Sequence, residues 1–318
     1  MTVTMHNNTY RPTRQIRRIK GLHKLLHHRL SVPLGVTESA LRGLKYAWNP
    51  AQTRHRAALA EQFERSDQDT FLEQYGYLRL EPYSLPGMRE ALEHCRGEYE
   101  KARAAGSISD IQSASVKEFL VSVIKDEDLL DHPDLFSFVV SPAVIKIAAK
   151  YFGAVPVLSS VRLWWTPPND MVTASQLFHC DREDQKQFKL LINVFDTTPE
   201  TGPFTFIPAD MSARLKKKIR YSYKNYRLPD ESIEAAGGLD ATVPLIGPPG
   251  AAACVDTSRC LHYGSRGNTR DRLVLMIQYT DCLAPNVTVP SWHESLSRLD
   301  VDLDESQQLA LGVSQTAA

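Results

Sequence analysis

The chain has 318 residues, of which 42% are hydrophobic and 23% charged, which is typical of a globular protein and not of a disordered one. No apolar run approaches the roughly 20 residues needed to span a bilayer, and the N-terminus shows no secretory signal. The five cysteines form no C-x-x-C pair, which argues against a disulfide framework or a zinc ribbon. We therefore expect a cytoplasmic protein without a transmembrane segment.

The net charge is zero, but the charges are unevenly distributed. Residues 1–60 hold eleven Lys or Arg and one acidic residue, Glu38, so the remainder carries a net charge of −10. Apolar residues recur in this basic arm at three- and four-residue steps: Ile16, Ile19, Leu22, Leu26 and Leu30. The spacing predicts a basic amphipathic helix. We expect the arm to pack on its own acidic body, with peripheral contact to anionic lipid or organelle targeting as alternatives.

The next part of the chain carries helix signals. Residues 71–80 read as the end of a helix, a glycine stop and a short strand. Residues 85–105 predict a helix, since they contain no breaker beyond an early glycine. Residues 141–152 predict another, with a serine N-cap, Pro142 in the first turn and Gly153 just past the end.

The pattern changes to short apolar runs near residue 155. These runs are separated by Gly, Pro, Asn and Asp, and cover residues 155–165, 188–195, 204–207, 242–246, 251–255 and 273–279. Short strands with turn residues between them predict a sandwich or barrel. A basic stretch at 210–238 lacks strand alternation and predicts a helix and loop outside the sheet. We expect a mostly β fold with flanking helices around a jelly-roll core.

The tripeptide His179-Cys180-Asp181 is the first candidate site. On a strand, residues i and i+2 point to the same face, so the two ligand types could reach one metal. His262, after a predicted strand, is the best third ligand. Two histidines and one carboxylate leave one face of an octahedral ion open, which suits iron(II). A His–Asp surface hydrogen bond is the alternative.

Arg272 lies ten residues after His262 and opens the apolar run RLVLMIQYT. A guanidinium at a strand start beside a metal site could bind the distal carboxylate of a dicarboxylate with two hydrogen bonds. The alternative is that Arg272 pairs with Asp256 or Asp271.

Four segments together carry a family resemblance: GYLRL, SQLFHCD, FKLLINVFDTTPETGPFTFIPADMS and CVDTSRCLHYGSRGNTRDRLVLMIQYT. Over roughly residues 70–282 the sequence resembles the phytanoyl-CoA dioxygenase-like family of Fe(II)/2-oxoglutarate oxygenases. The resemblance implies a cupin-like double-stranded β-helix (jelly-roll) core. It also implies that iron is bound by His179, Asp181 and His262, and 2-oxoglutarate by Arg272. The chain has Ala209-Asp210-Met211 where the family commonly has Gly-Ser-His.

The charge distribution and the resemblance together predict the organisation, and the resemblance implies the activity. We expect a basic arm at 1–60, a dioxygenase domain at 61–285 with its core at about 155–282 and an insertion at about 209–240, and a C-terminal tail at 286–318. The expected enzyme uses dioxygen and 2-oxoglutarate to hydroxylate an unactivated C–H bond, with release of succinate and carbon dioxide. Its substrate would be a small molecule, a lipid or a natural-product intermediate.

Four further residues are candidates for binding co-substrate or substrate. Gln176 and Lys189 stand where similar sequences often carry Gln and Lys, and could contact 2-oxoglutarate. Trp164 and Arg162 could line the substrate pocket. For the first two the alternative is a satisfied polar residue at the rim of a sheet.

Two other classes of function stay open. A zinc- or manganese-dependent hydrolase or isomerase could use the same ligands, and a binding module could keep the fold without catalysis. We expect no nucleic-acid partner, because the body is acidic and the basic arm lacks interleaved aromatic residues.

Overall fold

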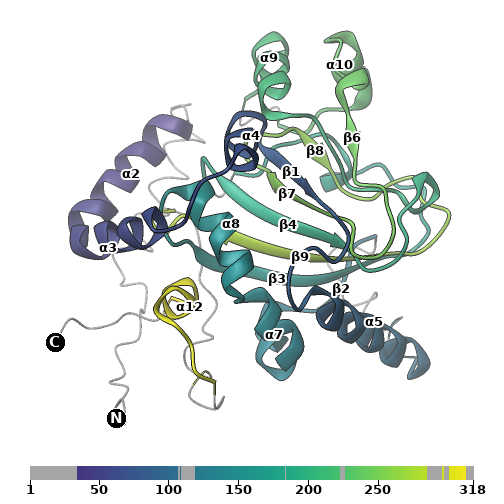
Figure 1. Ribbon diagram of the computed structural model, residues 1–318. Coiled ribbons are helices and arrows are strands. Elements are labelled where there is room, and N and C mark those ends of the chain that lie inside the picture. The colour runs from purple at the N-terminus through teal and green to yellow at the C-terminus, as the bar shows by residue number, and fades with distance from the viewer. Residues whose placement is uncertain are drawn as a thin grey trace.

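The computed structural model describes residues 34–106, 108, 119–182, 184–222, 226–284, 296 and 301–312 (Figure 1). The predicted helix with Ile16 to Leu30 lies outside these residues. The strands are β1 (Tyr77–Leu80), β2 (Val121–Ile124), β3 (Val157–Thr166), β4 (Gln187–Asn193), β5 (Thr205–Phe206), β6 (Val243–Pro244), β7 (Ala252–Asp256), β8 (His262–Tyr263) and β9 (Arg272–Thr280). The α-helices are α2 (Leu34–Trp48), α3 (Pro50–Glu61), α4 (Asp67–Tyr75), α5 (Met88–Ala104), α7 (Pro133–Val139), α8 (Pro142–Phe152), α9 (Ala209–Ile219), α10 (Asp230–Ala235) and α12 (Glu305–Ala310). Short 3-10 turns are η1 (Asp126–Asp131), η2 (Ala174–Gln176), η3 (Pro199–Thr201) and η4 (Leu239–Ala241).

The strands form two antiparallel sheets. The large sheet has six strands in the order β1-β7-β4-β9-β3-β2, and the small sheet has three in the order β6-β5-β8. In the large sheet, neighbours in space are distant in sequence, as in a jelly roll, where the chain passes back and forth between two sheets. The predicted fold class, mostly β with flanking helices around a jelly-roll core, is confirmed.

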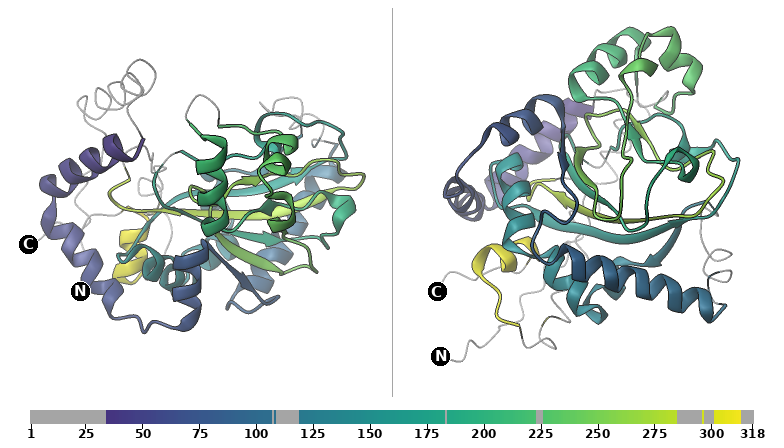
Figure 2. Two further views of the ribbon diagram at one scale, coloured as in Figure 1. Left: turned by 90° about the horizontal axis from the view of Figure 1, so that it is seen from above. Right: turned by 45° about the vertical axis from the view of Figure 1, so that its right-hand side comes forward.

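The two faces of the large sheet have different partners, because side chains alternate along each strand. One face packs against α5, α7 and α8 in the main hydrophobic core (Figures 1 and 2), with Leu92, Phe138, Ile145, Leu190 and Ile277 among its members. The opposite face, called here the inner face, packs toward the small sheet, with Phe204, Phe206, Ala253, Val255 and Val274 between them. Helices α9 and α10 lie on the far side of the molecule from α5 (Figure 2).

Local signals in the sequence explain several element boundaries. Helix α4 ends at Gly76, which has a φ of 72° and donates its N–H to Leu72. A side chain there would be strained, and an added Cβ would lie 2.8 Å from the Cys260 thiol. Helix α8 begins after Ser141 with proline in its first turn and ends at Gly153 in the left-handed conformation, as predicted.

The predicted strands match the structure with their ends displaced by one or two residues. Strands β2 and β8 were not predicted. Helix α5 starts at Met88, three residues later than expected, since Gly87 adopts a φ of 77°. The expectation that His179 and Asp181 lie on a regular strand is wrong: His179 forms an isolated bridge with His262, and Asp181 lies in the loop that follows.

One apolar stretch corrects the expectation that no run is long enough to span a bilayer. Pro133–Phe152 is long and apolar enough to cross a membrane by length and composition alone. In the structure it forms two helices, α7 and α8, that are separated at Val140 and Ser141. Their apolar faces pack against the large sheet, which is the arrangement of core helices.

The described part of the basic arm packs on the body through charge. Arg42 on α2 forms ion pairs with Asp184, at 2.9 Å, and with Asp281. Arg56 on α3 is buried and donates to the carbonyls of Val155, Pro156 and Leu309, at 2.9 to 3.2 Å. These contacts agree with the expected packing of a basic arm on an acidic body, and they join α3 to β3 and α12.

Candidate metal centre

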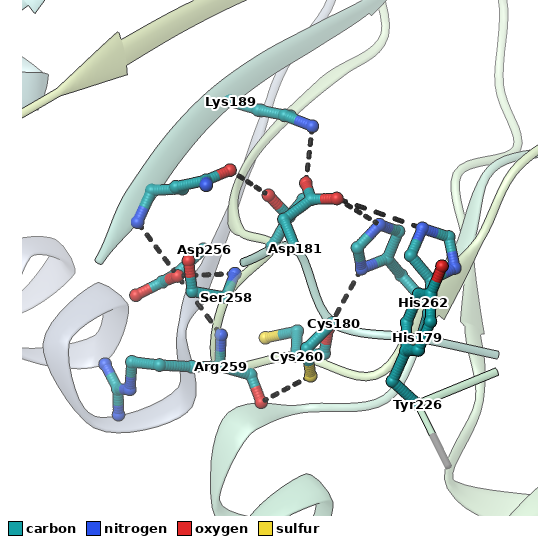
Figure 3. A network of polar contacts seen from close by, with 12 residues as sticks. His179, Cys180, Asp181, Lys189, Tyr226, Asp256, Ser258, Arg259, Cys260 and His262 are labelled. Atoms are coloured by element: carbon teal, nitrogen blue, oxygen red, sulfur yellow. Dashed lines mark hydrogen bonds and ion pairs between the residues drawn. The ribbon is translucent and has the colours of Figure 1, made fainter. Parts of the chain in front are cut away.

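Three residues that can bind a metal come together between the small sheet and the edge of the large one. The ligand atoms of His179, Asp181 and His262 all lie within 4.8 Å of one another (Figure 3). Oδ1 of Asp181 lies 3.8 Å from Nε2 of His179 and 3.9 Å from Nε2 of His262. Ligands at right angles around one ion are roughly 3 Å apart, so modest side-chain rotations would place all three on one ion.

Backbone hydrogen bonds fix the segment that carries the first two ligands. His179 exchanges two hydrogen bonds of 2.9 Å with His262, which places the histidines side by side. Asp181 donates its N–H to the carbonyl of Thr257 at 2.8 Å. The N–H of Cys180 is bound by the hydroxyl of Tyr221 at 2.8 Å. The ligand positions are therefore held by the main chain and not by side-chain packing alone.

Each imidazole is oriented by a hydrogen bond to the backbone carbonyl of the residue two positions earlier. Nδ1 of His179 lies 2.8 Å from the carbonyl oxygen of Leu177, and Nδ1 of His262 lies 3.0 Å from that of Cys260. A ring nitrogen that faces a carbonyl must carry the proton, which leaves the other nitrogen as a lone-pair donor. The Nε2 atoms that face Asp181 are thus the unprotonated ones, as metal ligation requires.

Lys189 on β4 holds the other oxygen of the carboxylate. Its Nζ donates to Oδ2 of Asp181 at 2.5 Å, while Oδ1 faces the histidines (Figure 3). Lys189 was expected to contact 2-oxoglutarate, whereas in the structure it pairs with Asp181. A charge-assisted hydrogen bond on one oxygen leaves the other to bind a metal.

Burial and charge keep the three ligands in their metal-binding protonation states. Burial would raise the pKa of Asp181, but Lys189 and the two histidines hold it well below its usual range. Burial and the neighbouring His179 lower the pKa of His262 to about 3. Burial likewise lowers the pKa of His179. At neutral pH the site therefore presents one carboxylate and two neutral imidazoles.

Asp256 holds the turn that carries Thr257, Cys260 and His262. Its Oδ1 accepts from the N–H groups of Ser258 and Arg259 (Figure 3) and of Gln187, at 3.0 to 3.2 Å. Its Oδ2 accepts from the Tyr151 hydroxyl. The carbonyl partners of Asp181 and His262 both belong to this turn. Asp256 was expected only as a possible partner for Arg272, and no local sequence pattern marks its role in this turn.

Arg272 at the start of β9 is a buried cation without a partner among the described residues. It is 4% exposed, and no hydrogen bond or ion pair joins its guanidinium to another residue in the described part of the chain. Burial alone lowers its pKa to about 10. The alternative pairing is wrong on both counts, because Asp256 is bound as described above and Asp271 accepts from Trp165 and Tyr99.

Two more unsatisfied polar atoms share the inner face with Arg272. Thr166 is its register partner on β3, and Asn193 on β4 is paired with Val274. The buried Thr166 Oγ1, Asn193 Oδ1 and Arg272 Nε have no hydrogen-bond partner among the described residues. Buried polar atoms are normally paired, so a cluster of such atoms indicates a place for a polar ligand.

This face is continuous with the metal centre. Val274, two residues after Arg272, packs in the same cluster as Phe204 of the small sheet. The ring centroids of Phe204 and His262 are 5.4 Å apart. Apolar packing through Val274 and Phe204 therefore connects the strand that begins at Arg272 to the ring of His262.

The remaining predicted site residues have partners within the chain. Gln176 is fully buried in η2, where its amide bonds to Thr173, Asn169 and Ser265 at 2.9 to 3.1 Å. Arg162 forms an ion pair of 2.5 Å with Asp126. Trp164 is half-buried on the inner face, beside Arg162.

A pocket of about 800 Å³ lies close to the centre but does not include its ligands. Its lining contains Leu177 and Tyr263, which precede or follow the histidines in sequence, together with Thr205. In the small sheet, Phe206 pairs with His262, and Phe206 packs in the cluster between the two sheets. Thr205 and Tyr263 form the neighbouring pair, whose side chains point to the opposite face. This pocket therefore lies on the outer side of the small sheet.

No family model and no curated protein matches the sequence. The solved structures that resemble the chain include the following three. The non-heme alpha ketoglutarate dependent epimerase SnoN from nogalamycin biosynthesis is 15% identical over 70% of this chain and 83% of that chain, with a TM-score of 0.44. EctD from S. alaskensis with 2-oxoglutarate and 5-hydroxyectoine is 13% identical over 70% and 77%, with a TM-score of 0.49. AviO1 from Streptomyces viridochromogenes Tue57 is 17% identical over 71% and 99%, with a TM-score of 0.48.

Proposed function

We propose that this protein is an Fe(II)- and 2-oxoglutarate-dependent oxygenase that acts on a small molecule, a lipid or a natural-product intermediate. The observation that carries the proposal is the combination of two features: the His179-Asp181-His262 triad, and a buried guanidinium, without a partner among the described residues, on the sheet face that packs toward the strand of His262. A metal centre alone would fit hydrolases and isomerases equally well. The buried guanidinium needs an anionic partner, and an acidic co-substrate would supply one.

The donor set fits iron(II). Two neutral imidazole nitrogens and one carboxylate oxygen give a ligand set of intermediate hardness, and this set is typical of non-heme iron oxygenases. Three protein ligands leave the other positions of an octahedral ion available to co-substrate and dioxygen. Because Lys189 binds Oδ2 of Asp181, the carboxylate would offer only Oδ1 to the metal.

The unsatisfied polar group around Arg272 fits the distal carboxylate of 2-oxoglutarate. A guanidinium presents paired N–H donors that match a carboxylate, and the Thr166 hydroxyl beside it can donate a further hydrogen bond. The space between the sheets is lined by Phe204, Val274 and other apolar side chains, which exclude water and strengthen such a pair. In this proposal Arg272 binds and orients the co-substrate, and the triad holds the metal against its other end.

Bound iron with 2-oxoglutarate and dioxygen supplies the oxidising power for attack on an unactivated C–H bond, with release of succinate and carbon dioxide. The chain's own part is to hold the ligands, orient the co-substrate and keep the inner space dry. Asp181 fills the carboxylate position, so no coordination site is left for a halide. We therefore expect oxygen transfer or dehydrogenation and no chlorination of the substrate.

A binding experiment tests the proposal without knowledge of the substrate. Protein loaded with Mn²⁺, a redox-silent substitute for iron, is titrated with 2-oxoglutarate while its melting temperature is recorded. Ligand that binds only the folded state raises the melting temperature. We expect a rise in the wild type that is lost in Asp181→Ala and in Arg272→Gln. A wild-type protein that 2-oxoglutarate does not stabilise at millimolar concentration would contradict the proposal.

Turnover distinguishes the proposed activity from its rivals. We expect slow succinate formation that requires Fe(II), 2-oxoglutarate and dioxygen together, and that disappears in His179→Ala and His262→Ala. A hydrolase or isomerase would show no such requirement. Succinate formation that persists in either histidine variant would remove that residue from the metal site.

A further inference from the structure

A second cluster of residues that can bind a metal lies apart from the triad. His94 and Glu98 are on α5, and His132 ends η1 and precedes α7. Their ligand atoms lie within 4.8 Å of one another, and all three residues are half-buried. We propose that His94, Glu98 and His132 form a second metal site that takes a divalent ion such as Zn²⁺ and joins α5 to the η1–α7 segment.

The helix geometry brings the first two ligands together. His94 and Glu98 are four residues apart, so they lie one turn apart on the same face of α5. The neighbouring positions Leu92, Cys95 and Tyr99 are buried in the main core, which fixes the rotation of the helix. His94 and Glu98 consequently face the segment where η1 meets α7.

The third ligand approaches from this segment. Nε2 of His94 lies 2.8 Å from Nδ1 of His132, and the ring centroids are 4.9 Å apart. Two imidazole nitrogens on one tetrahedral Zn²⁺ are roughly 3.3 Å apart, given Zn–N distances of about 2.0–2.1 Å. An adjustment of roughly half an ångström would therefore admit an ion between the two rings. Two histidines and one glutamate form a known zinc ligand set with a fourth position left for water.

The protonation states suit a cation. Burial and the neighbouring His94 lower the pKa of His132, so its ring stays neutral near pH 7. Lys101, which donates to Oε1 of Glu98 at 2.6 Å, lowers the pKa of that carboxylate. The His132 ring and the Glu98 carboxylate are therefore in the forms that bind zinc.

Lys101 is the competitor that an ion must displace. Its side chain is 75% exposed, and exposed ion pairs contribute little to stability. A divalent ion with two imidazole ligands can therefore replace it. A simple hydrogen bond between the histidines is the alternative, and in that case Glu98 would have no part in the site.

The location of the cluster indicates a structural role. Helices α5 and α7 cover one face of the large sheet, whereas the triad borders the opposite face (Figures 1 and 2). An ion here would link two helical segments on the outside of the core. It would add stability and take no part in chemistry at the first centre.

Zinc stoichiometry tests this proposal on the full chain. Chelator-treated protein is equilibrated with Zn²⁺, desalted, and its bound zinc is measured by mass spectrometry. We expect two equivalents in the wild type, one at each centre, and one equivalent in His94→Gln, in His132→Gln and in Asp181→Ala. His55→Gln is the matched control, because His55 pairs with a single carboxylate, that of Glu305, at 2.8 Å. It should keep two equivalents.

Affinity and stability provide the decisive readouts. In Asp181→Ala protein, Zn²⁺ should raise the melting temperature, and adding His94→Gln should abolish that rise. Lys101→Ala should tighten zinc binding several-fold, because Glu98 loses its competitor. Unchanged zinc content in both His94→Gln and His132→Gln would overturn the proposal, and unchanged affinity in Lys101→Ala would overturn the three-ligand site. The Lys101→Ala measurement remains decisive if the histidine variants fail to fold.

Discussion

Lys189 donates to Oδ2 of Asp181 at 2.5 Å, and this contact leaves Oδ1 to face His179 and His262. The lysine therefore sets which oxygen is available to a metal and how the carboxylate is turned. It also compensates the charge of a carboxylate that is taken out of water. We expect it to act on the metal through Asp181, as a positioning residue.

Lys189→Met should weaken Fe(II) binding by about 10- to 100-fold, which is typical for the loss of a group that orients a metal ligand. The affinity of the metal-loaded protein for 2-oxoglutarate should change much less. Separate anaerobic titrations of metal and co-substrate measure the two effects. The opposite pattern, with intact metal binding and poor 2-oxoglutarate binding, would assign the lysine to the co-substrate.

Arg272→Leu should separate stability from binding. The wild-type guanidinium is buried without a counterion in the described structure, so its replacement by an apolar side chain should leave the ligand-free protein at least as stable. Binding of 2-oxoglutarate should fall on the order of 100-fold, since a buried charge pair is lost. Urea unfolding and calorimetric titration measure the two quantities.

Arg270→Leu is the control, because Arg270 is exposed. It should bind 2-oxoglutarate as the wild type does. If Arg270→Leu rather than Arg272→Leu weakened binding, the side chain that holds the co-substrate would be misassigned by two positions.

Arg56→Ala should lower the free energy of unfolding by on the order of 3 kcal/mol, because three carbonyl groups lose a charged donor. These carbonyls belong to Val155 and Pro156, just before β3, and to Leu309 on α12. The exposed neighbour Arg54, changed to Ala, should have little effect. Equal stability of the two variants in urea would show that Arg56 does not join these segments.

The metal-free protein should lose stability in mild acid through its histidines. The pKa of His262 is about 3 when folded and 6.5 in the reference state, so the unfolded chain takes up a proton first as the pH falls below 6.5. This effect should cost about 2 kcal/mol at pH 5. In chelator, His262→Gln should therefore lose less stability than the wild type between pH 7 and pH 5, as measured in urea. Parallel losses in both proteins would contradict the lowered pKa.

Local patterns in the sequence were sufficient where the structure depends on local chemistry. Gly76 and Gly153 marked helix ends because the left-handed conformation there favours glycine. The triad could be predicted because His179 and Asp181 are two residues apart, and their side chains converge even though the segment is not a strand. His262 and Arg272 were proposed from their positions beside predicted strands and supported by the family resemblance, since sequence spacing does not reveal which distant strands are neighbours.

The features that sequence analysis missed all depend on long-range contacts. The pairing of Lys189 with Asp181, the turn held by Asp256, and the approach of His132 to His94 each require the folded arrangement. His94 and Glu98 could have been recognised as one face of a predicted helix. Nothing near them in the sequence indicates the third ligand, which comes from another segment.

The proposed function requires that the triad hold Fe(II) in a form that binds 2-oxoglutarate directly. Its most direct test is an anaerobic titration of Fe(II)-loaded protein with 2-oxoglutarate, followed by visible absorption spectroscopy. We predict a metal-to-ligand charge-transfer band that saturates at one equivalent of 2-oxoglutarate and is absent in His262→Ala, while the His94→Gln variant retains it. A wild-type protein that binds Fe(II) but develops no band at saturating 2-oxoglutarate would contradict the account.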